Sequence, residues 1–425
     1  MERLISLLGI LALLGIAFLM SNNKRKINFR TVLVGTGIQF SLGVVLLWWE
    51  PGVKAFRWLS DQVYTFLALS QVGVDFLFGE LGKPGNYGLY GPQIALIIAS
   101  TIIFFSAFMA ILYYLGVMQF IIEGMAKFMR WAMRTSGAES LSCSANIFVG
   151  QTEAPLLIRP FLNEMTVSEL HAVMVGGFAT IAGGVLASYM SLGVSAGHLI
   201  AASVMSAPAA LVMAKIIFPE TEHSKTAGDV KIPEVKLYDN VLDAAARGTT
   251  DGLKLAANVL AMLISFLALI ALVDVILGGC DTLIDGKLMG GTFMEGRGYE
   301  GIFPAKLSVL FGTIFAPLAF LMGVPWADAS IVGNLLGTKI AANEFVAYLQ
   351  LSQLISDGHL SERSITIATY ALCGFANFGS IGIQLGGIGS LAPGRRPELS
   401  KVALKAMFGG ALASWMTASI AGLLI

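Results

Sequence analysis

Long stretches without Asp, Glu, Lys or Arg constrain this chain more than any other feature of its sequence. The stretches free of these residues are Leu4–Asn23, Thr31–Trp49, Gln93–Ile122, Leu170–Ala214, Leu255–Val273, Ser364–Gly394 and Ala406–Ile425. A helix of about 20 apolar residues crosses the hydrocarbon layer of a bilayer. Because Leu170–Ala214 is long enough for two helices with a turn near Gly193–His198, the sequence predicts an all-α polytopic membrane protein with eight transmembrane helices.

The composition supports a lipid-facing surface and excludes several other classes of protein. Charged residues make up 13% of the chain, against roughly 25% in soluble domains. Lys plus Arg and Asp plus Glu both number 27, so the basic excess of a nucleic-acid-binding protein is missing. The cysteines Cys143, Cys280 and Cys373 are scattered without metal-ligand spacing, which indicates neither a disulfide framework nor a zinc site.

The distribution of basic residues predicts the orientation of the spans. With the N-terminus outside, eight spans leave most Lys and Arg residues inside, as the positive-inside rule requires. Both termini are then expected outside, in a bacterial inner membrane. Pro51–Glu80 carries several charges and is predicted to be an interfacial helix. Leu307–Ala327 would reverse this distribution if it crossed, so we expect a helix on the outer surface.

Two charged apolar stretches are predicted to be re-entrant helical hairpins of opposite orientation. The segments before and after Ser140–Asn163 are predicted to lie on the same side of the membrane. The same holds, on the opposite side, for the segments around Ser330–Leu354. Gly150 is expected to let the first hairpin turn, and Pro155 suits the first turn of its returning helix. Each hairpin is followed by two spans, so the order of elements repeats with inverted topology.

Matching broken-helix elements strengthen the prediction of an inverted repeat. Gly177–Gly183 reads GFATIAG, and Gly374–Ser380 reads GFANFGS. Inverted repeats with broken helices are typical of secondary transporters, whose substrate site lies between the halves. A re-entrant loop at membrane depth must be buried in protein or line a wet cavity. Both hairpin tips are therefore expected to face such a cavity.

The polar groups at the tips and breaks indicate a neutral substrate. They are Asn146, Gln151, Thr152, Glu153, Thr180, Lys339, Asn343, Glu344, Asn377 and Ser380. Carboxylates accept strongly from hydroxyl groups, and amides can bond donors and acceptors on a heterocycle, which suits a polyol that carries a ring. A phosphate or dicarboxylate would need several cations at the tips. In the alternative interpretation, Glu153 and Glu344 pair with Arg159 and Lys339 to stabilise the hairpins.

At this point the residues resemble those of a known family, the concentrative nucleoside transporters. Gly337–Tyr348 reads GTKIAANEFVAY and matches the family signature, and Gly150–Pro155 (GQTEAP) matches its other hairpin motif. The element at Gly374–Ser380 matches the later broken helix, and the order of segments is similar to the short bacterial form with eight spans. No HExxH or GxSxG motif occurs, so no enzyme is indicated.

The resemblance implies roles for particular residues. Gln151, Thr152 and Glu153 would meet the nucleobase of a uridine-like nucleoside, with Val185 against it. Glu344, Asn377 and Ser380 would meet the ribose, and Phe375 would line the pocket. The resemblance also implies that co-transported sodium binds at Asn146, Val149, Thr180 and Ile181. The family often has Ser where Thr180 stands, a departure that keeps the hydroxyl group.

The resemblance further implies a homotrimer in the lipid bilayer whose transport part slides like an elevator against a scaffold. The expected divisions are 1–122 (scaffold spans with the interfacial helix), 123–218 (first repeat), 219–254 (charged linker), 255–327 (scaffold span and surface helix) and 328–425 (second repeat). The function expected is sodium-coupled nucleoside symport. Proton coupling, another neutral solute such as a nucleobase or sugar, a channel and an intramembrane enzyme stay open as alternatives.

Overall fold

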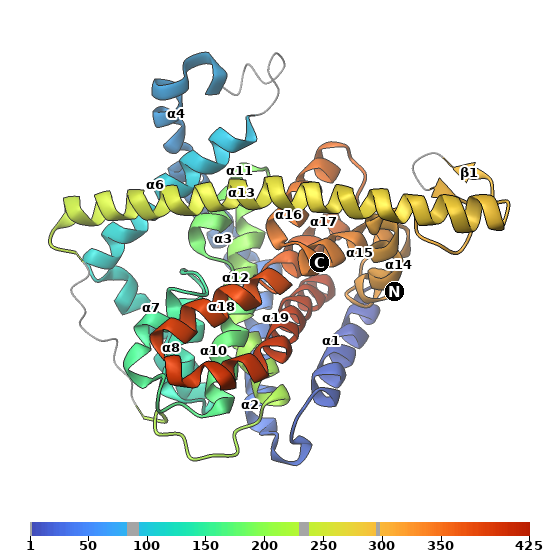
Figure 1. Cartoon of the computed structure of the whole chain (residues 1–425). Coiled ribbons are helices and arrows are strands. Elements are labelled where there is room, and N and C mark those ends of the chain that lie inside the picture. Colours follow the sequence, from blue (N-terminus) through green and yellow to red (C-terminus); the bar gives the residue numbers. More distant parts are fainter. Residues whose placement is uncertain (1, 83–92, 229–237, 295–297) are drawn as a thin grey trace.

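The computed structural model describes residues 2–82, 93–228, 238–294 and 298–425, and it is built almost entirely of helices (Figure 1). In chain order they are α1 (Glu2–Leu19), α2 (Phe29–Gly43), α3 (Glu50–Ala68), α4 (Ser70–Phe78), α6 (Ile94–Tyr114), α7 (Val117–Met133), α8 (Gly137–Ala145), α9 (Ala154–Leu157), α10 (Val167–Ala179), α11 (Gly183–Ser191), α12 (Ala196–Ile217), α13 (Val241–Asp281), α14 (Leu307–Leu321), α15 (Trp326–Ala341), α16 (Glu344–Ser356), α17 (Glu362–Leu372), α18 (Phe378–Leu391) and α19 (Arg396–Leu424). Two short strands, β1 (Phe293–Met294) and β2 (Gly298–Tyr299), pair in antiparallel fashion.

The all-α fold class predicted from the sequence is therefore confirmed, whereas the number of spans stays a prediction. In the described part of the chain, seven helical segments are long and apolar enough to cross a membrane. The bent pair α14–α15, whose axes differ by 117°, would make an eighth. The predicted span Ser364–Gly394 is divided into α17 and α18 at the predicted break Gly374–Ser380, and α18 counts only as a shorter apolar helix.

The helix α13 is longer than the predicted span Leu255–Val273. It runs unbroken for 41 residues and crosses the whole width of the molecule (Figure 1). Its first turns carry charges, which we assigned to the linker 219–254. A helix tolerates charges spaced four residues apart on its surface, and Arg247 Nε lies 2.9 Å from Asp243 Oδ1. Part of that linker, 229–237, lies outside the described residues. It includes Lys231 and Lys236, which were among the basic residues predicted to lie on the inner side of the membrane.

The two termini lie at the same end of the molecule. Arg3 Nε donates to the carbonyl oxygen of Ile425 at 2.9 Å, and Arg363 Nη1 donates to the same oxygen at 3.0 Å. The turn expected near Gly193–His198 is present, since α11 ends at Ser191 and α12 begins at Ala196. Gly193 has a φ of +89° in this turn, a conformation that glycine adopts without strain.

The packing of the helices separates two groups. The helices α10, α12, α17 and α19 contact one another and form the buried centre, while α6 and α13 pack mainly on each other. We expected α1, α2 and α6 to lie together in a scaffold. In the structure α1 packs on α19 and α14, and α2 packs on α12. The helices α1 and α2 thus contact the repeats more closely than the apolar runs alone could indicate.

Candidate functional site

The tip of the first hairpin is a short turn between α8 and α9. Asn146 is the C-cap of α8, and Pro155 lies in the first turn of α9, as predicted. Gly150 does not have the positive φ that we expected for a turn. A Cβ atom at this position would lie 2.3 Å from Glu153 Oε2. That oxygen ends an exposed and flexible side chain that can move aside, so neither space nor backbone conformation makes a glycine necessary here.

The tip of the second hairpin is a tight connection between α15 and α16. Asn343 has an extended backbone, and its Oδ1 accepts a hydrogen bond of 2.9 Å from the N–H of Val346. This side-chain cap fixes the start of α16 at Glu344. The Glu344 side chain is buried at the helix N-terminus, where the helix dipole favours a negative charge.

The two broken helices cross each other directly. The first break separates α10 from α11 and the second separates α17 from α18. The N–H of Phe375 donates to the carbonyl oxygen of Thr180 at 3.2 Å. Gly374, at φ +136°, lies so close to the first break that a Cβ atom would be 2.7 Å from the carbonyl oxygen of Phe178. A glycine is required here for both conformation and space.

A cavity of about 1000 Å³ lies at this crossing. All eight residues that we assigned to the substrate line it: Gln151, Thr152, Glu153, Val185, Glu344, Phe375, Asn377 and Ser380. They come from both hairpin tips and both breaks, so the repeats contribute jointly. The opposite wall comes from α6 and α13 and includes Phe105, Asn258 and Met262. The span pattern gave no signal for these wall residues, because each is one of many side chains along an uninterrupted helix.

The carboxylate of Glu344 is the most constrained polar group in the cavity. Its Oε1 accepts a hydrogen bond from the Tyr189 hydroxyl at 3.1 Å, and its Oε2 accepts one from Asn377 Nδ2 at 3.1 Å. The Tyr189 ring is fully buried and stacks on Tyr348 with centroids 4.2 Å apart. Sequence reasoning missed Tyr189, since a tyrosine in an apolar helix is ordinarily part of the core.

A second hydrogen-bonded chain orients Gln151. Its Nε2 donates to Ser380 Oγ at 3.1 Å, and its Oε1 accepts from Gln384 Nε2 at 3.0 Å. Gln384 Nε2 also donates to the carbonyl oxygen of Met174 at 3.2 Å. Sequence reasoning missed Gln384 as well. It lies four residues after Ser380, so both side chains are on one face of α18, and this spacing was the signal available.

The four residues assigned to sodium lie between the first hairpin tip and the first break. Asn146, Thr180 and Ile181 are buried, and Val149 lines the cavity. Asn146 Oδ1 is buried and accepts no hydrogen bond in the described part of the chain. A buried acceptor without a donor is costly, and an oxygen ligand for a cation would satisfy it. The donor set of amide, hydroxyl and carbonyl oxygens fits a sodium ion.

The alternative pairs of Glu153 with Arg159 and of Glu344 with Lys339 do not form among the described residues. Glu153 is exposed at the cavity. Lys339 is fully buried, and its Nζ donates to the carbonyl oxygen of Ala371 at 2.9 Å. The hairpins are therefore stabilised by their caps and packing rather than by these ion pairs.

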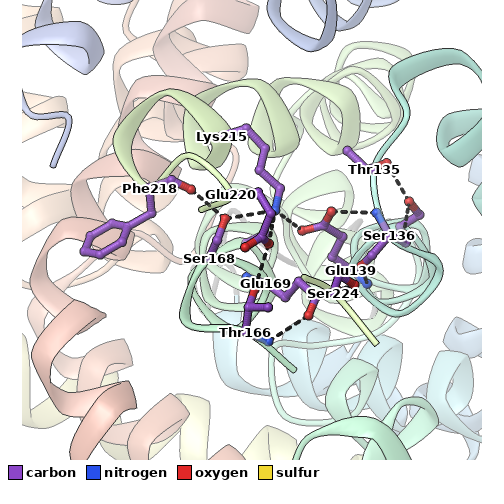
Figure 2. Close-up of polar contacts among 12 residues, drawn as sticks. Thr135, Ser136, Glu139, Thr166, Ser168, Glu169, Lys215, Phe218, Glu220 and Ser224 are labelled. Carbon is purple, nitrogen blue, oxygen red and sulfur yellow. Dashed lines mark hydrogen bonds and ion pairs between the residues drawn. The ribbon is translucent and has the colours of Figure 1, made fainter. Parts of the chain in front are cut away.

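A different buried lysine does form ion pairs (Figure 2). Lys215 Nζ lies 2.7 Å from Glu139 Oε2 and 3.6 Å from Glu220 Oε2, and it donates to Ser168 Oγ at 3.0 Å. The nearby Glu169 carboxylate caps α10 and accepts hydrogen bonds from Ser224 and Thr226. This cluster joins the starts of α8 and α10 to the segment that follows α12, with one ammonium group among three carboxyl groups.

Comparison with known proteins decides the family. The model described as "Na+ dependent nucleoside transporter N-terminus" matches 8–81, "Nucleoside recognition" matches 95–196, and "Na+ dependent nucleoside transporter C-terminus" matches 198–422. The chain belongs to the sodium-dependent nucleoside transporters. The resemblance to the concentrative nucleoside transporters is thereby confirmed, and this family comprises transporters rather than enzymes.

Two relatives are similar to this chain over its whole length. Sodium/nucleoside cotransporter 2 of Rattus norvegicus is 43% identical over all of this chain, which spans 63% of the length of the rat protein. The uncharacterized transporter YutK of Bacillus subtilis is also 43% identical, with both chains covered completely. The bacterial relative thus has the same extent as this chain.

The fold of this chain matches that of CNTnw. The structure of CNTnw in an inward-facing substrate-bound state has a TM-score of 0.91 and 41% identity, and covers 100% of this chain and 98% of CNTnw. A CNTnw variant in an outward-facing state also gives a TM-score of 0.91, at 41% identity and the same coverage. CNTnw therefore adopts both inward- and outward-facing states with this fold.

Proposed function

We propose that this chain is a sodium-coupled symporter that imports nucleosides across the bacterial inner membrane. The observation that carries the proposal is that eight polar and apolar side chains from both inverted repeats line one cavity of about 1000 Å³. A cavity of this size holds a small ligand. Its polar groups are uncharged except for the carboxylates of Glu153 and Glu344 and of Asp251 at the wall, which disfavours an anionic substrate.

We assign the ribose to the end of the cavity that contains Glu344, Asn377 and Ser380. A carboxylate accepts strongly from sugar hydroxyls, and the Glu344 oxygens keep free lone pairs beside their two existing hydrogen bonds. The Asn377 amide is fixed by its own role as N-cap of α18, where its Oδ1 accepts from the N–H of Ser380 at 2.8 Å. These groups are thus oriented before a substrate enters.

We assign the nucleobase to the end formed by the first hairpin tip. Gln151, Thr152 and Glu153 offer donors and acceptors for a base edge, and Val185 offers an apolar surface. Phe375 is half-buried at the cavity and would lie against the flat ring.

We assign the coupling ion to the oxygens of Asn146, Val149, Thr180 and Ile181. An ion there would order the tip that carries Gln151, so that ion and substrate each raise the affinity for the other. Proton coupling is the runner-up because Glu344 and Glu153 are titratable groups in the cavity. Sodium is favoured because its ligand set needs neither carboxylate.

We propose an elevator movement in which the repeats slide against α6 and α13. The packing of α1 on α19 and of α2 on α12 favours placing α1 and α2 with the moving body, in place of the scaffold 1–122 expected from sequence. The apolar side chains of α13 are largely exposed, among them Ile264 and Val275. Such a surface suits lipid or the homotrimer contact that we propose.

Uptake of uridine into proteoliposomes tests the proposed function. We expect counterflow of labelled uridine in sodium and concentrative uptake when an inward sodium gradient is imposed. Uracil and ribose should compete weakly, since each offers only part of the contacts. Equal uptake driven by a pH gradient in sodium-free buffer would overturn the ion assignment, and transport of uracil or ribose without uridine would overturn the substrate class.

A disulfide crosslink tests the elevator movement, because α16 contacts α13. Cysteines introduced into α16 and α13, in a background without Cys143, Cys280 and Cys373, should stop uptake when oxidised and restore it when reduced. A pair that links α10 to α19, within the moving body, is the matched control and should leave uptake intact. Uptake through a verified α16–α13 crosslink would exclude the elevator.

A further inference from the structure

The two inverted repeats differ at the helix ends beside their breaks. The last carbonyl groups of a helix have no partner within the helix. At the end of α10, the carbonyl oxygens of Phe178 and Ala179 accept no hydrogen bond from any residue that the structure describes. At the end of α17, the carbonyl of Ala371, which like Phe178 lies one residue before the helix end, accepts from Lys339 Nζ at 2.9 Å. The carbonyl three residues before the end is bonded in both repeats, that of Gly176 by the Thr180 hydroxyl and that of Thr369 by the Tyr348 hydroxyl.

Lys339 is unusual because its buried ammonium group forms no close ion pair with any described residue, although the Glu344 carboxylate is near enough to act on its charge. The side chain is fully buried, and burying a charge is costly unless it is paired. Its hydrogen bond goes to a helix C-terminus, where the negative end of the dipole favours a cation. Lys215 shows the contrasting case, since it is paired with Glu139 and Glu220 (Figure 2). The charge of Lys339 thus serves the helix end rather than an ion pair.

The position of Lys339 has a counterpart in the first repeat that carries no charge. Lys339 stands two residues before α15 ends at Ala341, and Cys143 stands two residues before α8 ends at Ala145. Among the described residues, the first repeat therefore has no side-chain cation bonded to the end of α10, where Asn146 Oδ1 also accepts no hydrogen bond. In the second repeat, the end of α17 is bonded by the ammonium group of Lys339, a cation that belongs to the chain itself.

We propose that Lys339 is a tethered cation which does for the second break what the co-transported ion does for the first. It neutralises the end of α17 and fixes the start of the break, so Phe375 and Asn377 stay oriented whether or not sodium is bound. The inference rests on the proposed sodium site, and it makes Lys339 a positioning residue that does not touch the substrate. Removing its charge should leave a place that a monovalent cation from solution can fill.

Uridine binding to purified protein, titrated with sodium against choline, tests the proposal. For Lys339→Met we expect affinity about 10- to 100-fold weaker at low sodium, recovered at high sodium with a steeper sodium dependence than wild type. Lys339→Gln can still donate one hydrogen bond but has no charge, and it should behave like Lys339→Met. Lys339→Arg keeps the charge and should keep the wild-type slope.

The outcomes separate the proposal from a purely structural role. If Lys339→Gln and wild type give sodium curves of equal slope and midpoint, a hydrogen-bond donor suffices and the proposal is wrong. A loss in Lys339→Met that sodium does not recover also overturns it. If wild type shows no sodium-dependent uridine binding, the proposed function fails instead.

A second measurement does not depend on a nucleoside. The melting temperature of the substrate-free Lys339→Met variant should rise more in sodium than in choline, and by more than that of wild type. If the neutral variants are not recovered as folded protein, extraction in high sodium should restore their yield. A yield that no sodium concentration restores, or equal melting shifts in variant and wild type, would contradict the tethered cation.

Discussion

The two hairpins meet at one cavity, but their polar groups differ in burial and in the hydrogen bonds that they accept. In the second, Glu344 is buried and accepts two hydrogen bonds, and Asn343 fixes the start of a long returning helix. In the first, Glu153 is exposed, the returning helix α9 has four residues, and Asn146 Oδ1 has no donor among the residues that the structure describes. The comparison teaches that the polar groups of the second hairpin are satisfied within the protein, whereas in the proposed sodium site an ion would satisfy the oxygen of the first.

The largest effect should separate the two glutamates. Glu344→Gln keeps the size of the side chain and loses charge-assisted acceptance from ribose hydroxyls, which should weaken uridine binding by roughly 1.5–3 kcal/mol. Glu153→Gln, at an exposed carboxylate without a protein partner, should cost less. Calorimetric titration with uridine measures both. Equal losses at the two positions would remove the asymmetry between the hairpins.

The next effect concerns the sodium dependence of the first hairpin. Asn146→Ala removes the unpartnered oxygen, so the gain in uridine affinity between choline and sodium should fall by about 10-fold. Ser144→Ala is a matched control, because Ser144 Oγ is also buried without a partner in the same helix and has no assigned ligand. A full sodium response in Asn146→Ala would take Asn146 out of the ion site.

A smaller effect tests the support of Glu344. Tyr189→Phe removes one neutral hydroxyl donor to Glu344 Oε1 and should weaken uridine binding by about 0.5–1.5 kcal/mol. Tyr370→Phe serves as the control, since its hydroxyl faces His198 at 3.4 Å outside the cavity lining. The loss should shrink for a deoxyribonucleoside that lacks the hydroxyl bound by Glu344. An identical loss for both ligands would indicate damage to packing instead.

The smallest effect should appear in the choice of base. Gln384→Leu frees the Gln151 amide from its partner, so the ratio of uridine to adenosine affinity should change a few-fold with little loss for uridine. Gln39→Leu is the control, because Gln39 is a buried glutamine that donates to Thr417 at 2.8 Å and lies outside the cavity lining. Competition assays with both nucleosides measure the ratio. An unchanged ratio would mean that Gln151 is oriented by Ser380 alone.

Sequence patterns predicted the helical class and the residues that gather at the cavity, because both depend on local chemistry. Apolar runs mark helices in lipid, and polar groups at membrane depth are too costly to occur without a reason. The Gly374–Ser380 element pointed to Asn377 and Ser380, which do line the cavity.

Other features depend on contacts between distant segments and could not be predicted. The packing of α1 on α19 follows from neighbours in space. The helix α13 extends well beyond the apolar run that marked it in the sequence. Tyr189 and Gln384 escaped notice because their partners are neighbours in space. Each has an ordinary residue type for its helix, and only the distance to Glu344 or Gln151 reveals its importance.

The hydrogen bond from Phe375 to Thr180 also bears on how this chain is assembled during synthesis. The first break is inserted long before Gly374 and Phe375 leave the ribosome, so until then the Thr180 carbonyl lacks its partner. The first half should therefore stay open to a small thiol reagent at a cysteine introduced within 177–183 when it is expressed alone. Co-expression of the second half should protect the same segment, since each half supplies the surface that the other lacks.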